Sequence, residues 1–400
     1  MILDFYLLKI IQFYYYFCFN TLIYFIQLIK NFNYFIIFYI LDFKFFFYNL
    51  ILEFSFKLSD IINFSYLTFK ILLSVTISIC ILISVAFFTL LERKKLGSFH
   101  NRIGPNNVGF LGLFQAIADG VKLILKESIL PRSSNLTVFL LSPILAFFFG
   151  LAGWAIIPFS YSTYLVNLNY SILFIFIISI FHIYGVILAG WSSNSRYSFL
   201  GALRSSAQLI SYDISIGLIL LNIFLCTKSL NILNIIEYQD FNGWFIWYLF
   251  LPFLLFLVCA LAETNRHPFD LPEAESELVS GYNVEYSAMG FALFFLGEYS
   301  AILFTSVFIT IIFLGAWLPL FNILSFIPPY IWFTSKVLLV NYFFFISRAV
   351  IPRYRYDQLM RIGWKFILPL ALGFFILNFS IFFISNSFII NYLSFVKILI

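Results

Sequence analysis

Long apolar runs separated by polar loops dominate the chain from residue 61 onward. About 20 apolar residues in a helix cross the hydrocarbon core of a bilayer, because each residue advances the helix by about 1.5 Å. On this criterion the sequence predicts eight membrane-spanning helices, near residues 65–91, 136–158, 171–190, 208–225, 244–262, 287–317, 328–348 and 366–385. The sixth run is long enough to tilt, or to break near Gly297 or Gly315. We therefore expect an all-α polytopic transmembrane bundle with eight core helices.

The first 60 residues form a separate apolar extension. Its apolar pattern is interrupted by charged residues, including Asp42 and Lys44 in the middle of the run 33–55. A span over about 10–29 fits the pattern better, so we expect one or two extra membrane-associated helices here. The start MILDFYLLKI has no basic segment and no Arg-rich amphipathic stretch, which is typical neither of a signal peptide nor of a transit peptide. We divide the chain into an extension, 1–60, and a transmembrane domain, 61–400.

Basic residues gather on one side of the predicted bundle. The loops after the first, third, fifth and seventh spans, with the ends of those spans, hold Arg93, Lys94, Lys95, Arg102, Lys122, Lys126, Arg132, Arg196, Arg204, Arg266, Arg348, Arg353, Arg355, Arg361 and Lys365. The opposite loops hold only Lys228, with Lys397 in the tail. Positive charge remains on the side from which a membrane protein is inserted, so this basic face is the matrix or cytoplasmic face.

The loop after the first span contains a short amphipathic segment over residues 111–126. One side carries apolar residues at helical spacing, and Asp119, Lys122 and Lys126 interrupt the other side. This pattern predicts a helix that lies at the membrane interface or against the bundle. Asp119 and Lys122 are three residues apart, which is a spacing at which the two side chains pair on a helix.

The loop 262–286, with the sequence AETNRHPFDLPEAESELVSGYNVEY, concentrates acidic residues. Six of the chain's 18 acidic residues lie there: Glu263, Asp270, Glu273, Glu275, Glu277 and Glu285. Pro268 and Pro272 exclude a continuous helix at its start, so we expect a partly extended loop opening into a short helix. Placing a carboxylate near a membrane costs free energy unless it is hydrated, paired with a cation or protonated. Such a cluster is therefore either a solvated acidic loop or a functional one. Clustered carboxylates also raise one another's pKa, which suits a proton relay.

Two further acidic residues lie inside predicted spans. Glu298 lies about 11 residues into the sixth span, roughly 17 Å from its start. A carboxylate at that depth costs at least ~2.5 kcal/mol on insertion scales, so we expect it to face the bundle interior. Asp213 lies about one and a half turns into the fourth span. For the nearby Arg204 and Arg266, pairing with carboxylates is favoured over a purely topological role.

The composition excludes several other functions. The 400 residues are 62% hydrophobic and only 10% charged, which excludes an ordinary soluble domain. The four cysteines, Cys18, Cys80, Cys226 and Cys259, are far apart, and the three histidines form no pair, so we expect no metal site. The chain contains neither a GxGxxG motif nor a P-loop. We therefore expect no cofactor bound by this chain alone and no nucleic-acid partner.

Four long motifs resemble a known family. They are LLERKKLGSFHNRIGPNNVG, GWSSNSRYSFLGALRSSAQLISYD, AETNRHPFDLPEAESELVSGYNVEYSAMGFALFFLGEY and RAVIPRYRYDQLMRIGWKFILPL, and all lie on the predicted basic face. In this order they resemble the matrix-side signatures of the NADH–ubiquinone oxidoreductase chain 1 family, the membrane subunit of respiratory complex I that meets the peripheral arm. The resemblance runs from about residue 65 to 385 and leaves the extension uncovered.

The resemblance implies a ubiquinone-binding chamber and an acidic path that couples quinone reduction to proton translocation. The residues it implies for the proton path and quinone coupling are Glu263, Glu273, Glu275, Glu277, Glu285, Glu298 and Asp213. Those it implies for the chamber and its loops are Arg93, Arg102, Asp119, Lys122, Arg204, Arg266, Phe269 and Asp270. Relatives usually carry Glu where this chain has Asp213. Because Asp is one methylene shorter, two alternatives stay open at this position: direct proton transfer, or transfer through a bridging water.

The same resemblance implies the setting of the protein. Ubiquinone is the substrate, whereas NADH, FMN and iron–sulfur clusters are held by partner subunits. The implied partners are lipids and other complex I subunits, both of the peripheral quinone module and of the membrane arm. The implied location is the mitochondrial inner membrane, ahead of a bacterial plasma membrane. Two alternatives remain: the homologous subunit of a membrane-bound hydrogenase, and a stand-alone proton-coupled transporter, for which the sequence offers no internal repeat.

Overall fold

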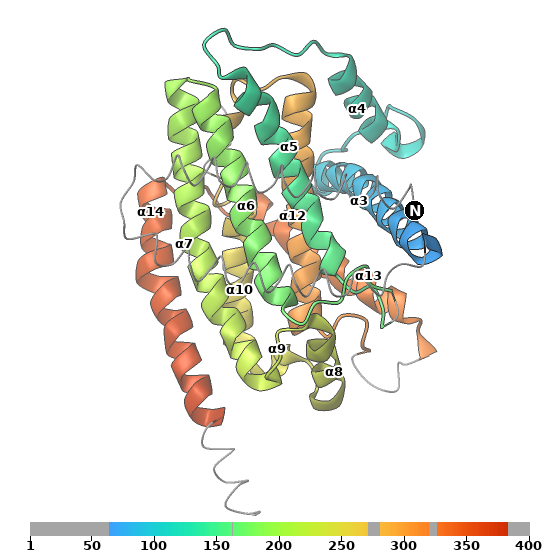
Figure 1. Ribbon diagram of the computed structural model, residues 1–400, viewed down its shortest axis with the longest axis vertical. Helices are drawn as coiled ribbons and strands as arrows, with labels where there is room; N and C mark the ends of the chain where they lie inside the picture. The colour runs from blue at the N-terminus through green and yellow to red at the C-terminus, as the bar shows by residue number, and fades with distance from the viewer. Residues whose placement is uncertain (1–63, 162, 271–280, 320–325, 383–400) are drawn as a thin grey trace, which may run out of the picture. The chain divides into compact units, whose positions relative to one another are not determined.

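The computed structural model describes residues 64–161, 163–270, 281–319 and 326–382. Its contacts divide the chain into two compact units, Met1–Leu72 and Leu73–Ile400, and the helical bundle from Leu73 onward belongs to the second unit. Every regular element of the described residues is a helix (Figure 1). The expected extension over residues 1–60 lies outside the described residues, as do Glu273, Glu275 and Glu277.

In the described residues, six long helices, several short ones and one long C-terminal helix of mixed type make up the bundle. The long helices are α3 (Phe64–Phe99), α5 (Leu136–Ala152), α6 (Ser171–Ser192), α7 (Arg196–Thr227), α12 (Ala288–Phe313) and α13 (Pro329–Val350). The short ones are η1 (Phe110–Gly112), α4 (Gln115–Leu125), η2 (Gly153–Ile156), α8 (Ile232–Asn242), α9 (Phe245–Tyr248), α10 (Phe250–Glu263), η3 (Gly281–Asn283), α14 (Tyr356–Arg361) and η5 (Ile362–Ile367). The last two belong to one continuous helix, Tyr356–Phe382, with a π-helical turn at η5.

Seven helices of the described residues are long and apolar enough to cross a membrane, and α10 is a shorter apolar helix. This confirms the predicted all-α polytopic bundle. The seven correspond to the predicted spans one to four and six to eight, while α10 stands at the place of the fifth. With 14 residues it is shorter than predicted, because residues 245–248 form the separate helix α9.

Two spans have different ends from those expected. Helix α7 begins at Arg196, twelve residues before the predicted residue 208, so Asp213 lies much deeper in its helix than one and a half turns. Its first part is rich in Ser, Gly and Ala, which a hydropathy criterion misses although several of these small residues are buried. Helix α12 passes through Gly297 without a break and ends at Phe313, just before Gly315 with its left-handed φ of 68°.

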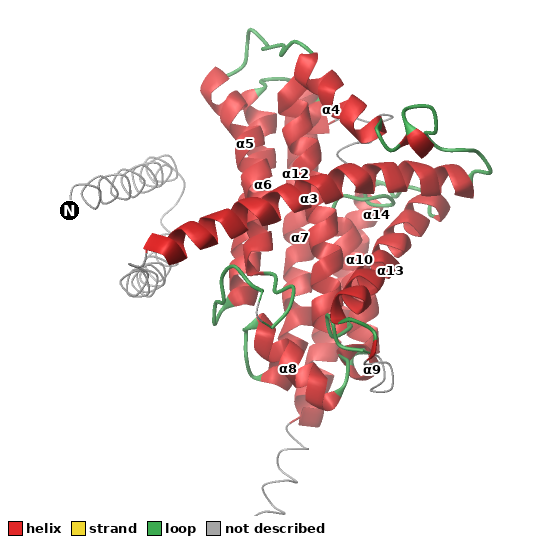
Figure 2. Cartoon of the chain, turned by 90° about the vertical axis from the view of Figure 1, so that its right-hand side faces the viewer, coloured by secondary structure: helices red, strands yellow, loops and turns green. Residues whose placement is uncertain are grey.

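Five helices pack in a closed ring. Helix α5 packs against α6, α6 against α7, α7 against α10, α10 against α12, and α12 against α5. Figure 2 shows these helices from the side. Helix α13 packs on α12, and the α14–η5 segment packs on α7. The buried core includes Tyr212, Ile219, Phe256, Ile309 and Phe313, which expose 1% of their surface or less. The ring therefore brings α7, α10 and α12, which carry the candidate acidic residues, into one unit.

The short element η3 approaches α7 at two glycines. A Cβ placed on Gly201 would lie only 2.6 Å from the Cα of Gly281, which is closer than any tolerated contact. Gly281 itself has a φ of 58°, a left-handed conformation that glycine adopts without steric cost. The two glycines therefore let the loop before α12 lie directly on α7.

The C-terminal end of α12 is capped by two buried side chains. The Lys336 ammonium on α13 donates hydrogen bonds to the carbonyls of Leu314, Ala316 and Leu318, at 2.6, 2.9 and 2.6 Å. It also lies 3.9 Å from the centre of the Trp244 ring. The Gln239 amide on α8 donates to the carbonyls of Ile311 and Ile312, both at 3.0 Å. Carbonyls that a helix end would leave without donors are thereby satisfied.

Candidate functional site

The carboxyl groups of Asp213 and Glu263 come together inside the bundle. Glu263 is the last residue of α10, and α10 packs against α7, which carries Asp213. The two half-buried carboxyl groups are close enough for their charges to interact. The Asp213 Oδ2 atom is fully buried and accepts no hydrogen bond from the described residues. Two like charges that interact in a buried place disfavour each other, so the arrangement disfavours ionisation of both carboxyl groups at once.

A buried glutamine on α7 joins α10 to the loop that follows it. Gln208 exposes none of its surface, and its Nε2 donates to the carbonyl oxygens of Ala262, at 2.8 Å, and Phe269, at 2.9 Å. These two carbonyls directly precede Glu263 and Asp270. One side chain therefore holds both ends of the segment 263–269.

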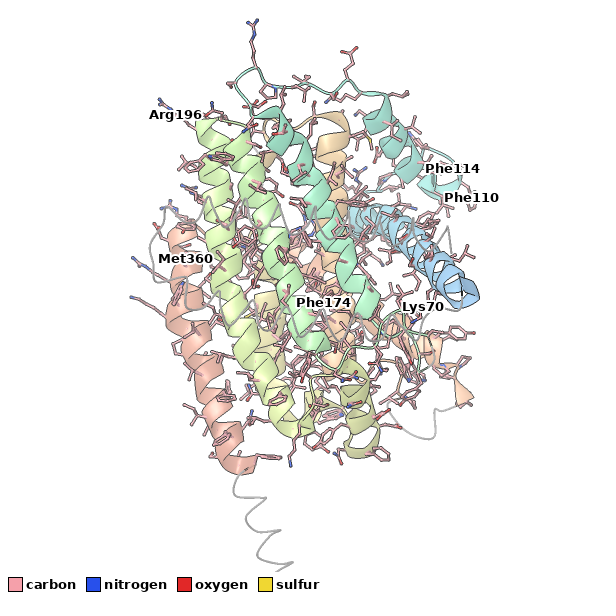
Figure 3. All side chains as sticks on the ribbon, in the orientation of Figure 1. Lys70, Phe110, Phe114, Phe174, Arg196 and Met360 are labelled. Atoms are coloured by element: carbon pink, nitrogen blue, oxygen red, sulfur yellow. The ribbon has the colours of Figure 1, made fainter. Side chains whose placement is uncertain are left out.

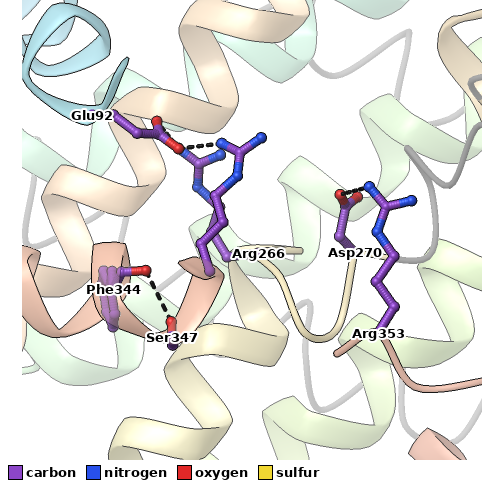
Figure 4. A network of polar contacts seen from close by, with 7 residues as sticks. Glu92, Arg266, Asp270, Phe344, Ser347 and Arg353 are labelled. Carbon is purple, nitrogen blue, oxygen red and sulfur yellow. Dashed lines mark hydrogen bonds and ion pairs between the residues drawn. The ribbon is translucent and has the colours of Figure 1, made fainter. Parts of the chain in front are cut away.

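The loop 264–270 is also attached to the loop after α13. The Arg353 guanidinium lies 3.3 Å from Asp270 (Figure 4). The Tyr354 backbone N–H donates to the Pro268 carbonyl at 3.2 Å. The Phe269 and Tyr354 rings stack with centroids 5.8 Å apart. Phe269 and Asp270 are themselves buried. The beginning of the acidic loop is thus a fixed structure rather than an exposed turn.

A second charged cluster joins α3, α13 and the loop after α10. Glu92 exposes 2% of its side chain and pairs with both Arg266 and Arg348 (Figure 4). The Arg266 guanidinium also lies over the Tyr299 ring of α12, 4.6 Å from its centre. Such a buried carboxylate is tolerated because two guanidinium groups and an aromatic face surround it.

The predicted membrane carboxylate Glu298 accepts a hydrogen bond from Tyr282. Glu298 lies on α12, and Tyr282 is the central residue of η3 and is almost fully buried. Nearby, the Tyr286 hydroxyl is hydrogen-bonded to Ser142 at 2.8 Å and lies 3.4 Å from the Ser192 hydroxyl. Glu285 lies in the half-buried turn between these two tyrosines. The contact with Tyr282 fits the expected inward orientation of Glu298.

The amphipathic segment forms a separate charged site on the α3 side. Asp119 of α4 pairs with Arg93 of α3 at 2.7 Å and with the Gln115 amide at 3.1 Å, rather than with Lys122. Lys122 and Arg102 are exposed. Phe110 and Phe114 also project from this segment and expose 78% and 60% of their surface (Figure 3). Helix α4 buries none of its residues and leaves an apolar side uncovered.

The structure therefore sorts the predicted residues into groups. It brings Asp213 to Glu263, places Phe269 and Asp270 in the loop beside them, and gives Glu298 a tyrosine partner. Arg204 lies 5.8 Å from the Tyr356 ring centre, and Arg266 pairs with Glu92. Arg93, Arg102, Asp119 and Lys122 belong to the α3–α4 side. The described residues contain no group of three or more His, Cys, Asp or Glu side chains arranged to hold a metal.

Sequence reasoning did not single out Glu92, Gln208, Arg348 or Arg353 as site residues. The available signal for Glu92 was its position as the acidic residue of the LLERKK motif, at the end of an apolar run. Arg348 and Arg353 were noted only as two of the basic residues on the predicted basic face. Gln208 carries no charge and follows a run of small polar residues, so the sequence marks it only weakly.

Comparison with known proteins agrees with this architecture. A family profile described as NADH dehydrogenase matches residues 69–379. The chain is 52% identical over 307 residues to NADH-ubiquinone oxidoreductase chain 1 of Cyanidium caldarium, covering 76% of this chain and 89% of that relative. It is 51% identical over 295 residues to the protein of the same name from Arabidopsis thaliana, covering 73% and 90%. It is 51% identical over 316 residues to an NADH-quinone oxidoreductase subunit of Rickettsia typhi, covering 78% and 93%. The chain therefore belongs to the NADH dehydrogenase family, among the membrane proteins that include NADH-ubiquinone oxidoreductase chain 1.

Proposed function

We propose that this chain forms the membrane part of a ubiquinone chamber in a respiratory NADH:quinone oxidoreductase, and that its acidic residues couple quinone reduction to proton translocation. The observation that carries this proposal is the Asp213–Glu263 pair inside the bundle, at the base of a rigid loop. The names of the relatives support the quinone as substrate. Relatives from an alga and a plant support the mitochondrial inner membrane as the location.

Reduction of a quinone to a quinol takes up two electrons and two protons. The electrons come from partner subunits that hold NADH, FMN and iron–sulfur clusters, so this chain supplies binding, orientation and proton transfer. The loop 264–270 forms part of the chamber wall, and the Arg353–Asp270 contact holds it in place. Glu263 and Asp213 then share a proton that one of them releases when the charge in the chamber changes.

Glu298 continues the path into the membrane part of the protein. It is the eleventh residue of α12, and the Tyr282 hydroxyl that bonds to it lies in η3, immediately after the acidic loop. Tyr282 is thus a group through which the loop and the membrane carboxylate interact. We extend the proposed path to Glu285, and also to Glu273, Glu275 and Glu277, which lie outside the described residues.

The test uses Glu298→Gln in the assembled, membrane-bound complex. We expect normal assembly and at least about tenfold less proton pumping, a change of ~1.4 kcal/mol in the relevant barrier. Tyr282→Phe should show a smaller loss in the same direction. Asp240→Asn, which removes an exposed carboxylate on α8, is the matched control and should pump normally. Normal pumping by an assembled Glu298→Gln complex would contradict the proposed path.

Purification distinguishes the proposal from its two alternatives. We expect the chain to purify only within a large assembly that oxidises NADH and reduces quinone. Copurification with a hydrogenase module would support the first alternative. Purification of the chain alone, with solute transport in liposomes, would support a stand-alone transporter.

A further inference from the structure

Gln208 stands in an unusual position relative to the proposed proton path. Both N–H bonds of its amide are used, one for the Ala262 carbonyl and one for the Phe269 carbonyl. Asp213 lies five residues further along the same helix, a rise of about 7.5 Å. The glutamine therefore links the helix that carries Asp213 to the residue that directly precedes Glu263.

The orientation of this amide is fixed by its surroundings. Two carbonyl oxygens face its nitrogen, so an exchange of Nε2 and Oε1 would bring three oxygens together without a hydrogen between them. The Oε1 atom is fully buried and receives no hydrogen bond from the described residues. A buried acceptor without a donor is costly, which makes a purely space-filling role for this side chain unfavourable.

The first bond attaches the end of α10 to α7. The Ala262 carbonyl lies in the last turn of α10, where it also accepts the Asn265 backbone N–H at 3.3 Å, so the Gln208 bond ties the turn that carries Glu263 to the α7 side chain. The second bond, to Phe269, holds the far end of the segment 263–269 against the same α7 side chain. Because Ala262 directly precedes Glu263, movement at this first bond would change the separation of Glu263 from Asp213.

We propose that Gln208 is a positioning residue that sets the distance between Asp213 and Glu263 and thereby controls proton sharing between them. The inference rests on the proposed function, because it assigns a role toward the same acidic pair. Gln208 does not exchange protons itself. Its two N–H donors hold the backbone so that the two carboxyl groups meet.

The same helix offers a matched control. Asn222 is also fully buried, donates to the Leu218 carbonyl at 3.1 Å and accepts a bond from Asn378 at 2.9 Å. Its loss removes a buried amide of α7 and its hydrogen bonds. Its hydrogen bonds reach its own helix and the last helix, and leave Asp213 and Glu263 untouched.

The experiment compares Gln208→Met with Asn222→Leu in the assembled complex. Redox-induced infrared difference spectra report the C=O stretch of protonated carboxyl groups, and Asp213→Asn and Glu263→Gln assign the band of the pair. We expect Gln208→Met to shift this band and to lower proton pumping about tenfold, with the KM for a short-chain quinone unchanged. Asn222→Leu should lower the melting temperature but leave the band and the pumping unchanged.

The outcomes separate this inference from the function on which it rests. Normal pumping in both Asp213→Asn and Glu263→Gln would overturn the proton path itself. Loss of pumping in those two variants, with a normal band and normal pumping in Gln208→Met, would overturn only the positioning role. If Gln208→Met does not assemble, Gln208→Asn retains a donor on a shorter stem and should give a smaller shift. Failure of both variants to assemble would also overturn the inference, because Gln208 would then act in folding alone.

Discussion

Glu92 on α3 and Arg266 after α10 form an ion pair although 174 residues separate them in the chain. Glu92 exposes 2% of its side chain and Arg266 12%, so the pair is almost removed from solvent. Arg348 of α13 completes the cluster. Three distant segments of the chain therefore depend on one carboxylate for their mutual placement.

Replacement of Glu92 by Gln should strongly destabilise the protein. The change leaves two guanidinium groups without their counter-charge, and breaking a buried ion pair from one side costs about 3–5 kcal/mol. We expect a large drop in melting temperature and in the yield of assembled complex on native gels. Asp119→Asn breaks the exposed pair with Arg93 and should cost less than about 1 kcal/mol. Equal effects of the two substitutions would show that burial does not determine the contribution of Glu92.

Replacement of Lys336 by Met should loosen the end of α12. The carbonyls of Leu314, Ala316 and Leu318 would lose their donor in a buried place, at about 1–3 kcal/mol for each unsatisfied group. We expect a lower melting temperature and faster amide exchange in the last turn of α12. Ser335→Ala on the neighbouring exposed position is the control and should behave as the parent protein. A parent-like Lys336→Met would exclude the capping role.

The stability of the loop after α10 should depend on pH through His267. Burial lowers the pKa of His267 below its ordinary value of 6.5, and Arg353 and Arg348 lower it further. Since the unfolded state then binds more protons, His267 contributes stability that is complete above about pH 6.5 and decreases as the pH falls through the lower folded pKa. The melting temperature should therefore decrease on acidification below that value. His267→Gln should remove part of this decrease, and an unchanged pH profile in that variant would contradict the assignment.

The apolar pattern located most spans because their lengths are dictated by the bilayer. The predicted run 171–190 became Ser171–Ser192, and 328–348 became Pro329–Val350. The beginning of α7 was missed because its small polar residues form a helix through close packing, which hydropathy does not register. The fifth span was overestimated because an apolar run does not reveal the break between α9 and α10.

The sequence points to the candidate site through acidic residues that are costly to bury, and their roles stay a prediction. Asp213, Glu263 and Glu298 were conspicuous, since carboxyl groups are rare in apolar sequence, and the structure gives each an interacting group. Their neighbours were not predictable, because contacts such as Arg266 with Glu92 or Asp270 with Arg353 join segments far apart in the chain. Gln208 shows the same limit, since its role depends on two backbone carbonyls that a sequence does not display.

The burial of Lys336 has a consequence for how the chain enters the bilayer. Lys336 is the eighth of the 22 residues of α13. A lysine costs up to about 2.5–3.5 kcal/mol at the centre of a membrane helix on insertion scales, so this lysine disfavours independent insertion of α13. Three carbonyls that satisfy its ammonium lie in the segment that directly follows α12. Helices α12 and α13 are therefore expected to leave the insertion machinery together as a hairpin. Lys336 is therefore expected to affect the insertion of the chain into the membrane before it affects any step of the reaction.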